Sequence, residues 1–351
     1  MSKRVLMTGH NGYLGSAMAQ RFGDAGHRVA GLDTFFFRQC TFNDDAANQP
    51  AVEKDIREVT LRDLEGFDAV VHLAALSNDP VGDLNDRWTE EINTEAAVRL
   101  AEAAREAGVR RFLFSSSCIM YGAAMEAEVD EDSPLDPKTA YARSKVAAER
   151  RIARLATDRF SPVFLRNGTV YGLSPRMRFD TVINSLVGSA IATGKVTVYS
   201  DGTPWRPVVH IEDVASIFLA ALEAPAERVH NQAINAGWPD SNHCVAEMAQ
   251  IVARTVPGCQ VECLARPGAD QRTYKTRFAK MSRLLPGVRM RWTLEDGVRT
   301  LHRQLCSRLT EREFRDKRFT RLKWLRHLID TGQLDDSLRW AEALVFAEAH
   351  P

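Results

Sequence analysis

Apolar positions over the first 120 residues alternate between two periods. Short continuous apolar runs, each predicted to form a buried strand, occupy residues 5–7, 28–33, 69–73 and 111–114. Helix formers at helical spacing predict helices over 14–22 and 96–107, and Gly108 is a stop signal for the second. Because buried strands that alternate with helices are typical of βαβ units, the pattern predicts an α/β fold built on a doubly wound parallel sheet.

After residue 120 the alternation of apolar strands and helices is less regular. Further helices are predicted over residues 143–156, 213–223 and 245–254. Residues 173–207 and 256–292 contain more Pro, Gly and polar interruptions, which is typical of a smaller, looser region. Residues 303–326 hold nine Lys or Arg and three Asp or Glu, which indicates either a binding tail or solvated helix faces that pack on the protein. We favour the second interpretation.

Composition narrows the class of protein. The 351 residues, 44% of them apolar, suffice for one large or two small globular domains. The balance of 46 basic and 46 acidic residues disfavours a dedicated nucleic-acid binder. No apolar run approaches the roughly 18–20 residues of a membrane span, and the N-terminus lacks a signal core, so we expect a cytoplasmic protein without a membrane partner. None of the six cysteines forms a Cys-x-x-Cys pair, so no metal site is predicted.

A glycine-rich turn follows the first predicted strand and opens the first predicted helix. Gly9, Gly12 and Gly15 permit a tight turn in which backbone N–H groups approach a pyrophosphate at the positive end of the helix. Asp33 ends the second strand, where a carboxylate accepts hydrogen bonds from ribose hydroxyls and repels a 2′-phosphate. The pattern therefore predicts NAD rather than NADP, a preference that the nearby Arg38 can soften.

Two further groups of residues carry chemistry. Tyr141 and Lys145 are four residues apart, so on a helix they share one face. A neighbouring ammonium favours phenolate, and we expect it to lower the pKa of Tyr141 from about 10 toward working pH, as suits a general acid–base. Ser117 follows the strand at 111–114, and ligands of a doubly wound sheet bind at the carboxyl ends of its strands.

In this combination the sequence resembles the extended short-chain dehydrogenase/reductase family, in its nucleotide-sugar epimerase/dehydratase branch. The resemblance covers residues 3–300 and rests on motifs in this order: TGHNGYLG at 8–15, Asp33, Asp55-Ile56, HLAA at 72–75, Asn93, SSSCIMYG at 115–122, YARSK at 141–145, LRNGTVYG at 165–172 and DGTPWRPVVHIEDVA at 201–215. It implies a Rossmann-type sheet domain at 1–172, to which 206–237 returns. It also implies a smaller, discontinuous substrate-binding domain at 173–205 and 238–302. A helical tail at 303–351 lies beyond the part that we can interpret.

The resemblance implies contacts for the cofactor NAD and for a nucleotide-diphosphate sugar. The residues that it places on or around NAD are Gly9, Asn11, Gly12, Tyr13, Leu14, Gly15, Asp33, Asp55, Ile56, Leu73, Ala74, Ala75, Asn93 and Lys145, of which Asn93 matches a helix-supporting asparagine. Tyr141 is the implied acid–base, and Ser117 hydrogen-bonds the reacting sugar oxygen. The resemblance implies that Arg206 binds the substrate diphosphate and that either Arg266 or Arg272 is a second diphosphate contact. For each of these arginines, a surface salt bridge is an equally good interpretation. The family also implies a homodimer through the helix that carries Tyr141.

Departures from the family pattern bear on the reaction. Sugar 4,6-dehydratases of this branch carry Asp-Glu directly after the catalytic Thr, and Cys118 and Ile119 stand at those places here. Ile119 cannot act as a base, which disfavours an ordinary 4,6-dehydratase. Cys118 is either a thiol that takes part in proton transfer at the substrate or a small buried residue, and we favour the second. Thr169 replaces a substrate-binding Asn, and Arg178, with Arg176, falls in a loop that usually faces the sugar or its diphosphate.

These observations favour an NAD-dependent nucleotide-sugar epimerase that transiently oxidises a sugar hydroxyl with Tyr141 as acid–base. The alternative is an NAD(P)H-dependent reductase or dehydrogenase of a 4-ketosugar nucleotide or a related carbonyl. A sugar-nucleotide dehydratase and a non-catalytic nucleotide-binding protein are less favoured, because the first lacks its acid and base and the second has no need of Ser117, Tyr141 and Lys145.

Overall fold

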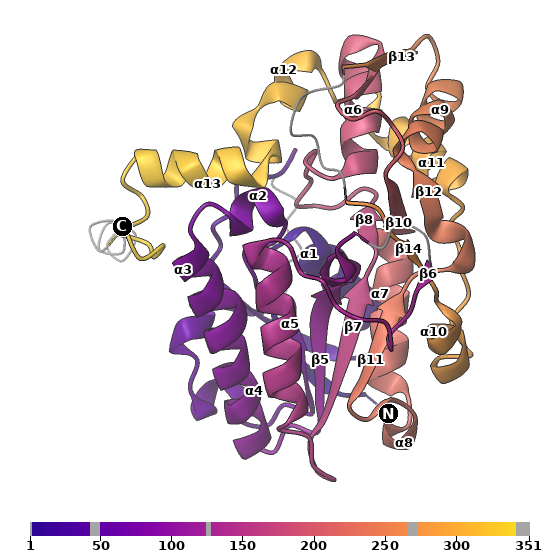
Figure 1. The fold of residues 1–351 in the computed structure, drawn as a ribbon. Coiled ribbons are helices and arrows are strands. Elements are labelled where there is room, and N and C mark those ends of the chain that lie inside the picture. Colours follow the sequence, from indigo (N-terminus) through magenta and orange to yellow (C-terminus); the bar gives the residue numbers. More distant parts are fainter. Residues whose placement is uncertain (1, 43–49, 124–127, 265–271, 342–351) are drawn as a thin grey trace.

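A seven-stranded parallel sheet forms the centre of the computed structural model, which describes residues 2–42, 50–123, 128–264 and 272–341 (Figure 1). The strand order is β11-β7-β5-β4-β1-β2-β3, with β1 paired to both β2 and β4. The strands are β1 (Arg4–Thr8), β2 (Arg28–Asp33), β3 (Ala51–Glu53), β4 (Ala69–His72), β5 (Arg111–Ser117), β7 (Ser161–Asn167) and β11 (Gln232–Ala236). The doubly wound sheet expected from the apolar pattern is thereby confirmed.

Alternating side chains on the central strands bury both faces of this sheet. Val5 and Met7 point to the face covered by α1 (Tyr13–Asp24) and α7 (Ile211–Glu223). Leu6 points to the other face, covered by α4 (Ala97–Glu106) and α5 (Ala140–Ala153). Successive side chains of a strand point to opposite faces, so a strand buried on both sides reads as an unbroken apolar run.

A smaller region beside the sheet carries a separate core. Its strands are β8 (Thr169–Tyr171), β9 (Lys195–Val198), β10 (Trp205–His210), β12 (Asn242–Cys244) and β13 (Gln260–Cys263), and a further pair is β6 (Glu128–Val129) with β14 (Lys275–Thr276). Its helices are α6 (Val182–Thr193), α9 (Val245–Thr255) and α11 (Leu294–Leu305), and α8 (Ala226–Val229) and α10 (Ala279–Leu284) lie nearer β11 in Figure 1. The prediction of a loose region at 173–207 is therefore wrong for its central part, because α6 is a regular helix that buries most of its residues.

Helix boundaries differ from the sequence pattern where capping decides them. α5 begins three residues before the predicted start, since the Thr139 side chain accepts a hydrogen bond from the N–H of Ala142. The predicted helix at 96–107 is preceded by a π-helical segment, Glu90–Ala96. Short helices α2 (Asp79–Gly82) and α3 (Asp86–Thr89) precede that segment, and both are capped by asparagine side chains.

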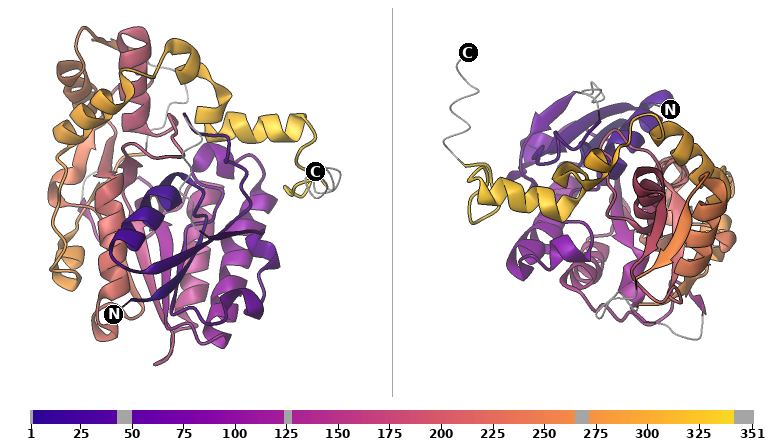
Figure 2. Two further views of the ribbon diagram at one scale, coloured as in Figure 1. Left: turned by 180° about the vertical axis from the view of Figure 1, so that it is seen from behind. Right: turned by 90° about the horizontal axis from the view of Figure 1, so that it is seen from above.

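The C-terminal segment packs back onto the sheet domain, as the favoured reading of its charge pattern expected. It contains α12 (Glu311–Arg315) and α13 (Arg321–Asp330), and α13 lies above α2 in Figure 1 and at one side of the molecule, against the purple helices, when seen from above in Figure 2. Trp324, Leu325, Leu328, Leu334 and Leu338 join the core cluster that covers the α4 and α5 face. No helix among the described residues is long and apolar enough to cross a membrane.

Candidate active site

A cavity of about 740 Å³ opens at the carboxyl ends of β1, β2, β4 and β5 and continues to the smaller region. The strand order reverses beside β1, and in open α/β sheets ligands bind at such a point. Most of the sequence-predicted residues line this cavity: Gly9, Gly12, Tyr13, Leu14, Gly15, Asp33, Asp55, Ile56, Leu73, Ala74, Ala75, Ser117, Tyr141, Lys145, Thr169, Arg178, Arg206 and Arg272. Asn11, Asn93 and Cys118 do not, and Arg266 lies outside the described residues.

The glycine turn leaves room for a phosphate group at the start of α1. Gly9 has φ of +74°, and a Cβ there would lie 2.6 Å from the backbone N of Ala74, so β1 and the segment after β4 approach too closely for any side chain. Gly12 is the N-cap of α1 and offers no side-chain acceptor to the first N–H groups of the helix. The turn therefore fits a pyrophosphate, which would accept hydrogen bonds from these N–H groups.

Asp33 lies at the end of the cavity where the resemblance places the adenosine. Its carboxylate accepts hydrogen bonds from the N–H groups of Asn11, at 2.9 Å, and Phe35, at 2.8 Å. Burial raises the pKa of Asp33, and these N–H groups and His10 oppose that rise. The Asn11 side chain instead accepts a hydrogen bond from Nε of Arg176 at 3.0 Å, so Asn11 shapes the turn and does not line the cavity.

Two other predicted NAD residues have mainly structural partners. Asn93 is buried, and its amide bonds both backbone groups of Leu76 and the hydroxyl of Ser144, which ties the segment after β4 to α5. This placement agrees with a helix-supporting role and not with direct contact to the cofactor. Asp55 lines the cavity, but its carboxylate is also bound by the Arg57 guanidinium at 2.6 Å.

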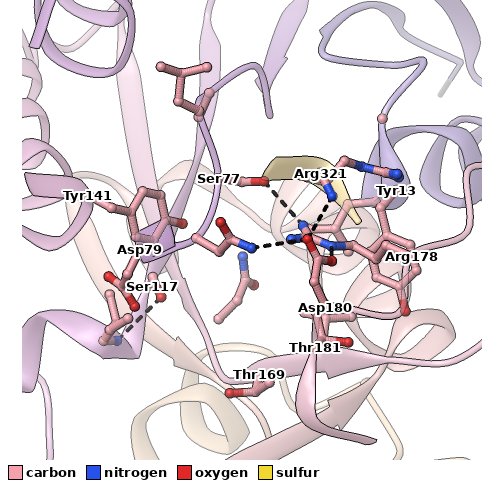
Figure 3. Close-up of a pocket in the computed structure, with 18 of the residues that line it drawn as sticks. Tyr13, Ser77, Asp79, Ser117, Tyr141, Thr169, Arg178, Asp180, Thr181 and Arg321 are labelled. Carbon is pink, nitrogen blue, oxygen red and sulfur yellow. Dashed lines mark hydrogen bonds and ion pairs between the residues drawn. The ribbon is translucent and has the colours of Figure 1, made fainter. Parts of the chain in front are cut away.

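Ser117, Tyr141 and Lys145 gather at the sheet end of the cavity. Ser117 ends β5 and caps the short turn Cys118–Tyr121, and Tyr141 and Lys145 lie one helical turn apart on α5. The Ser117 side chain lies close enough to Tyr141 to lower the pKa of its hydroxyl. Nζ of Lys145 donates to the backbone oxygen of Ser115 at 2.8 Å and lies 5.7 Å from the centre of the Tyr141 ring. Figure 3 shows Ser117 and Tyr141 side by side.

Electrostatics at Tyr141 differ from the sequence expectation. Burial, followed by the nearby Asp79 carboxylate, raises the pKa of Tyr141 to about 12, and Arg178 and Ser117 act in the opposite direction. Burial also lowers the pKa of Lys145 to about 8, which weakens its charge at alkaline pH. The expected lowering of the Tyr141 pKa by Lys145 is therefore wrong, because burial and Asp79 raise this pKa and Lys145 is not among the groups that lower it.

Asp79 is a site residue that sequence analysis missed. It is the first residue of α2, follows Asn78 at φ +77°, and lines the cavity next to Tyr141 (Figure 3). Its carboxylate accepts a hydrogen bond from Thr139, the N-cap of α5, at 2.5 Å and pairs with Arg272 at 2.5 Å. A non-glycine residue at positive φ is an uncommon, strained conformation that often marks a functional site, but no sequence periodicity reveals it.

Arg178 supplies a buried positive charge to the middle of the cavity. Its Nε pairs with Asp180 at 2.5 Å and its Nη1 donates to Ser77 at 3.3 Å, whereas Nη2 has no hydrogen-bond partner among the described residues. The side chain is 7% exposed. Asp180 also accepts the backbone N–H of Arg321 at 2.9 Å (Figure 3). An unpartnered guanidinium N–H in a buried cavity fits an anionic oxygen.

The remaining predicted substrate residues divide into two groups. Thr169 on β8, Arg206 on β10 and Arg272 line the cavity, and Nη1 of Arg206 donates to the backbone oxygen of Arg272. Cys118 is fully buried behind the strand end, where its thiol donates to the Arg166 backbone oxygen at 3.1 Å. Burial raises the pKa of this thiol to about 12. The structure thus corrects the expectation that Cys118 contacts substrate and supports the packing role that we favoured.

Comparison with known proteins identifies the family. Residues 5–237 match the model of the NAD dependent epimerase/dehydratase family, and the chain belongs to this family of NAD-dependent enzymes. It is 31% identical over 241 residues to a UDP-glucose 4-epimerase of Corynebacterium glutamicum, which covers 63% of this chain and 71% of the relative. It is 27% identical over 234 residues to a dTDP-D-glucose 4,6-dehydratase of Mus musculus, over 63% of this chain and 65% of that one.

A solved structure similar to the chain is MoeE5 in complex with UDP-glucuronic acid and NAD. It has a TM-score of 0.75 and 27% sequence identity, and the match covers 86% of this chain and 98% of MoeE5. The resemblance inferred from the motifs is confirmed, and NAD is the cofactor of the family.

Proposed function

We propose that this protein is a nucleotide-sugar epimerase that oxidises a sugar hydroxyl transiently and reduces the resulting ketone from its other face. The observation that carries the proposal is the meeting of Ser117, Tyr141 and Lys145 in one cavity, where Ile119 is part of the wall and Cys118 is not. A dehydration needs an acid and a base beyond this set, and the two positions that supply them in related dehydratases offer neither here.

In this proposal each residue of the site has its own role in the reaction. NAD, when bound, supplies a hydride acceptor next to the sugar. Tyr141 takes the hydroxyl proton during oxidation and returns it during reduction, and Ser117 hydrogen-bonds the same oxygen. Lys145 holds α5 against β5 through the Ser115 backbone oxygen, which fixes the distance between Ser117 and Tyr141. Gly9, Gly12 and Gly15 hold the pyrophosphate of NAD, and Asp33 holds its adenosine ribose.

The substrate in this proposal is a nucleotide-diphosphate sugar. Arg178, Arg206 and Arg272 place three guanidinium groups along the cavity, and planar guanidinium groups suit phosphate oxygens. Nη2 of Arg178, which has no hydrogen-bond partner in the described part of the chain, supports a role in binding an anionic group. Relatives that act on UDP-glucose, and the neighbour that binds UDP-glucuronic acid, support the nucleotide-sugar class.

The experiment that tests the proposal has two parts. Purified protein is denatured and the released nucleotide is identified, and the protein is then incubated with a panel of UDP and dTDP sugars that is followed by NMR. Inversion of one sugar centre without added nucleotide, abolished in Tyr141→Phe, is the expected result. Steady consumption of NADH or NADPH with a ketosugar nucleotide favours the reductase alternative, and loss of water from the sugar favours a dehydratase.

The homodimer and the cytoplasmic location remain predictions. A dimer through the helix that carries Tyr141 would bring α4 and α5 of two copies together. Sedimentation velocity of the purified protein, compared with a variant that carries Arg150→Glu on the exposed side of α5, tests this arrangement.

A further inference from the structure

The C-terminal segment reaches the part of the cavity that is predicted to hold the adenosine of NAD. Nε1 of Trp340 donates to the backbone oxygen of Thr34 at 2.6 Å, and Nε1 of Trp324 donates to that of Phe36 at 2.7 Å. Thr34 and Phe36 line the cavity directly after Asp33. The ring of Trp340 also packs edge-on against Phe36, with 5.4 Å between ring centres.

The C-terminal segment also supports the cavity residues that follow β3. Arg57 pairs with Asp55 at 2.6 Å, and its other N–H groups donate to the backbone oxygens of Ser337, at 2.6 Å, and Leu338, at 2.8 Å. The Arg57 side chain is 4% exposed. Asp55 and Ile56 line the cavity just after β3, as Thr34 and Phe36 do after the neighbouring β2, so one stretch of chain contacts both lining segments.

A third contact reaches further into the cavity. Arg321, at the start of α13, is buried, lines the cavity and donates to the backbone oxygens of Met177, at 3.1 Å, and Arg176, at 2.6 Å. Its guanidinium lies 4.9 Å from the centre of the Phe37 ring. Through its backbone N–H it also orients Asp180, the partner of Arg178.

The loop that these contacts hold is strained. Phe35 has φ of +56°, a conformation that is costly for a bulky side chain and persists only where the surroundings impose it. The N–H of Phe35 donates to Asp33, so a change at Phe35 would also release the carboxylate predicted to bind ribose. Contacts on both sides of Phe35, at Thr34 and Phe36, come from the C-terminal segment.

From these contacts we propose that residues 320–341 hold the outer wall of the NAD adenosine site in place and slow the release of the cofactor. The family model ends at residue 237, so the motifs that define the family do not include this supporting segment. The proposal rests on NAD as cofactor and not on the epimerase reaction. A slow release suits an enzyme that regenerates its cofactor in each turnover, whereas a reductase must exchange it.

The test measures NAD release without using catalysis. NAD-loaded protein is mixed with an excess of NAD glycohydrolase, which destroys free NAD, and the NAD that stays bound is measured over time after rapid gel filtration. Trp340→Ala removes a hydrogen bond and the packing against Phe36, and we expect NAD release at least tenfold faster than from the wild type. Trp340→Phe keeps an aromatic ring and loses the hydrogen bond to Thr34, and we expect a smaller, several-fold increase.

A matched control is Trp292→Phe. Nε1 of Trp292 donates to Glu212 at 3.1 Å, and neither residue lines the cavity, so this variant loses a tryptophan hydrogen bond without touching the adenosine site. We expect unchanged NAD release from it. Circular dichroism and the melting temperature with saturating NAD show that each variant is folded. The proposal is overturned if folded Trp340→Ala releases NAD within twofold of the wild-type rate, or if the wild type itself releases NAD within seconds.

Discussion

Asp79 and Arg272 form an ion pair of 2.5 Å that joins the sheet domain to the smaller region across the cavity. The side chains are 13% and 20% exposed, so the pair is partly shielded from water. Asp79 acts on Tyr141 as a neighbouring negative charge, and Arg272 is a predicted contact of the substrate diphosphate. The pair therefore connects the substrate-binding end of the cavity with the acid–base.

Replacing Asp79 with Asn is expected to shift the pH dependence of kcat to lower pH. Burial and the Asp79 carboxylate both raise the pKa of Tyr141, so removal of the charge lowers that pKa and the active form is reached at lower pH. The other groups that face Tyr141, namely Ser117 on β5, Arg178 after β8 and Lys145 on α5, remain in place. A pH–rate profile measures the shift, and Asp86→Asn on exposed α3 is the control. An unchanged profile in Asp79→Asn would falsify the assignment.

Replacing Asp180 with Asn is expected to destabilise the protein by about 3–5 kcal/mol, the usual cost of breaking a buried ion pair. Asp180 pairs with Arg178, whose side chain is 7% exposed, and bonds the backbone of Arg321. Although burial alone raises the pKa of Asp180, Arg178 lowers it below the ordinary value of 3.8. Its stabilising contribution is thus present above pH 3.8 and disappears as the pH falls through the lowered value.

Urea unfolding at pH 7 and pH 3 measures this effect. Asp180→Asn should be less stable than the wild type at pH 7, and the difference should narrow at acid pH. Asp316→Asn, which removes a more exposed partner from Arg318, should cost much less at pH 7. Equal losses in the two variants would contradict the prediction.

Replacing Lys145 with Met is expected to abolish most activity and to change how stability depends on pH. Burial lowers the pKa of Lys145 to about 8 from 10.5, so between these values the unfolded chain binds more protons than the folded protein. Stability contributed by this group therefore rises from pH 8 to pH 10.5. Denaturant unfolding at pH 7.5, 9 and 10 should show this rise in the wild type relative to Lys145→Met. A constant difference between the two proteins would show that Lys145 is not buried as a charge.

Replacing Gly82 with Ala is expected to reduce kcat at least tenfold while leaving NAD bound. A Cβ at Gly82 would lie 2.9 Å from Cβ of Tyr141 and 3.2 Å from its backbone N, so α2 or α5 has to move. Gly287→Ala is the matched control, because no atom of the described residues lies within 4 Å of a Cβ added there. Steady-state kinetics and NAD content measure the outcome. Normal kcat in Gly82→Ala would mean that the active site tolerates a displaced Tyr141.

The sequence pattern predicted the sheet because both of its faces are buried and each strand reads as an apolar run. It also led to Gly9, Asp33, Tyr141 and Lys145, which the structure brings to one cavity, because these residues belong to short motifs whose chemistry depends on local spacing. Their roles in binding and catalysis remain predictions.

Other residues could not be found in this way because their environment comes from distant segments. Asp79 begins a helix of only four residues and follows the strained Asn78. A helix this short leaves no periodic pattern in the sequence. Arg321 lies in a strongly basic stretch that predicts a solvated surface, but its contacts with the segment at 176–180 and with Phe37 bury it. Helix α6 was obscured by the Pro, Gly and polar residues around it, although its own face is apolar.

The bridge from Arg57 to the carbonyl groups of Ser337 and Leu338 has a consequence for handling the protein. A protease that cuts after residue 330 would leave the sheet intact and remove both carbonyl partners of the arginine that holds Asp55. Such a preparation would keep its folded sheet domain, yet contain a mixture of nucleotide-loaded and empty molecules. Its specific activity would then vary between batches according to how much of the C-terminus survived purification.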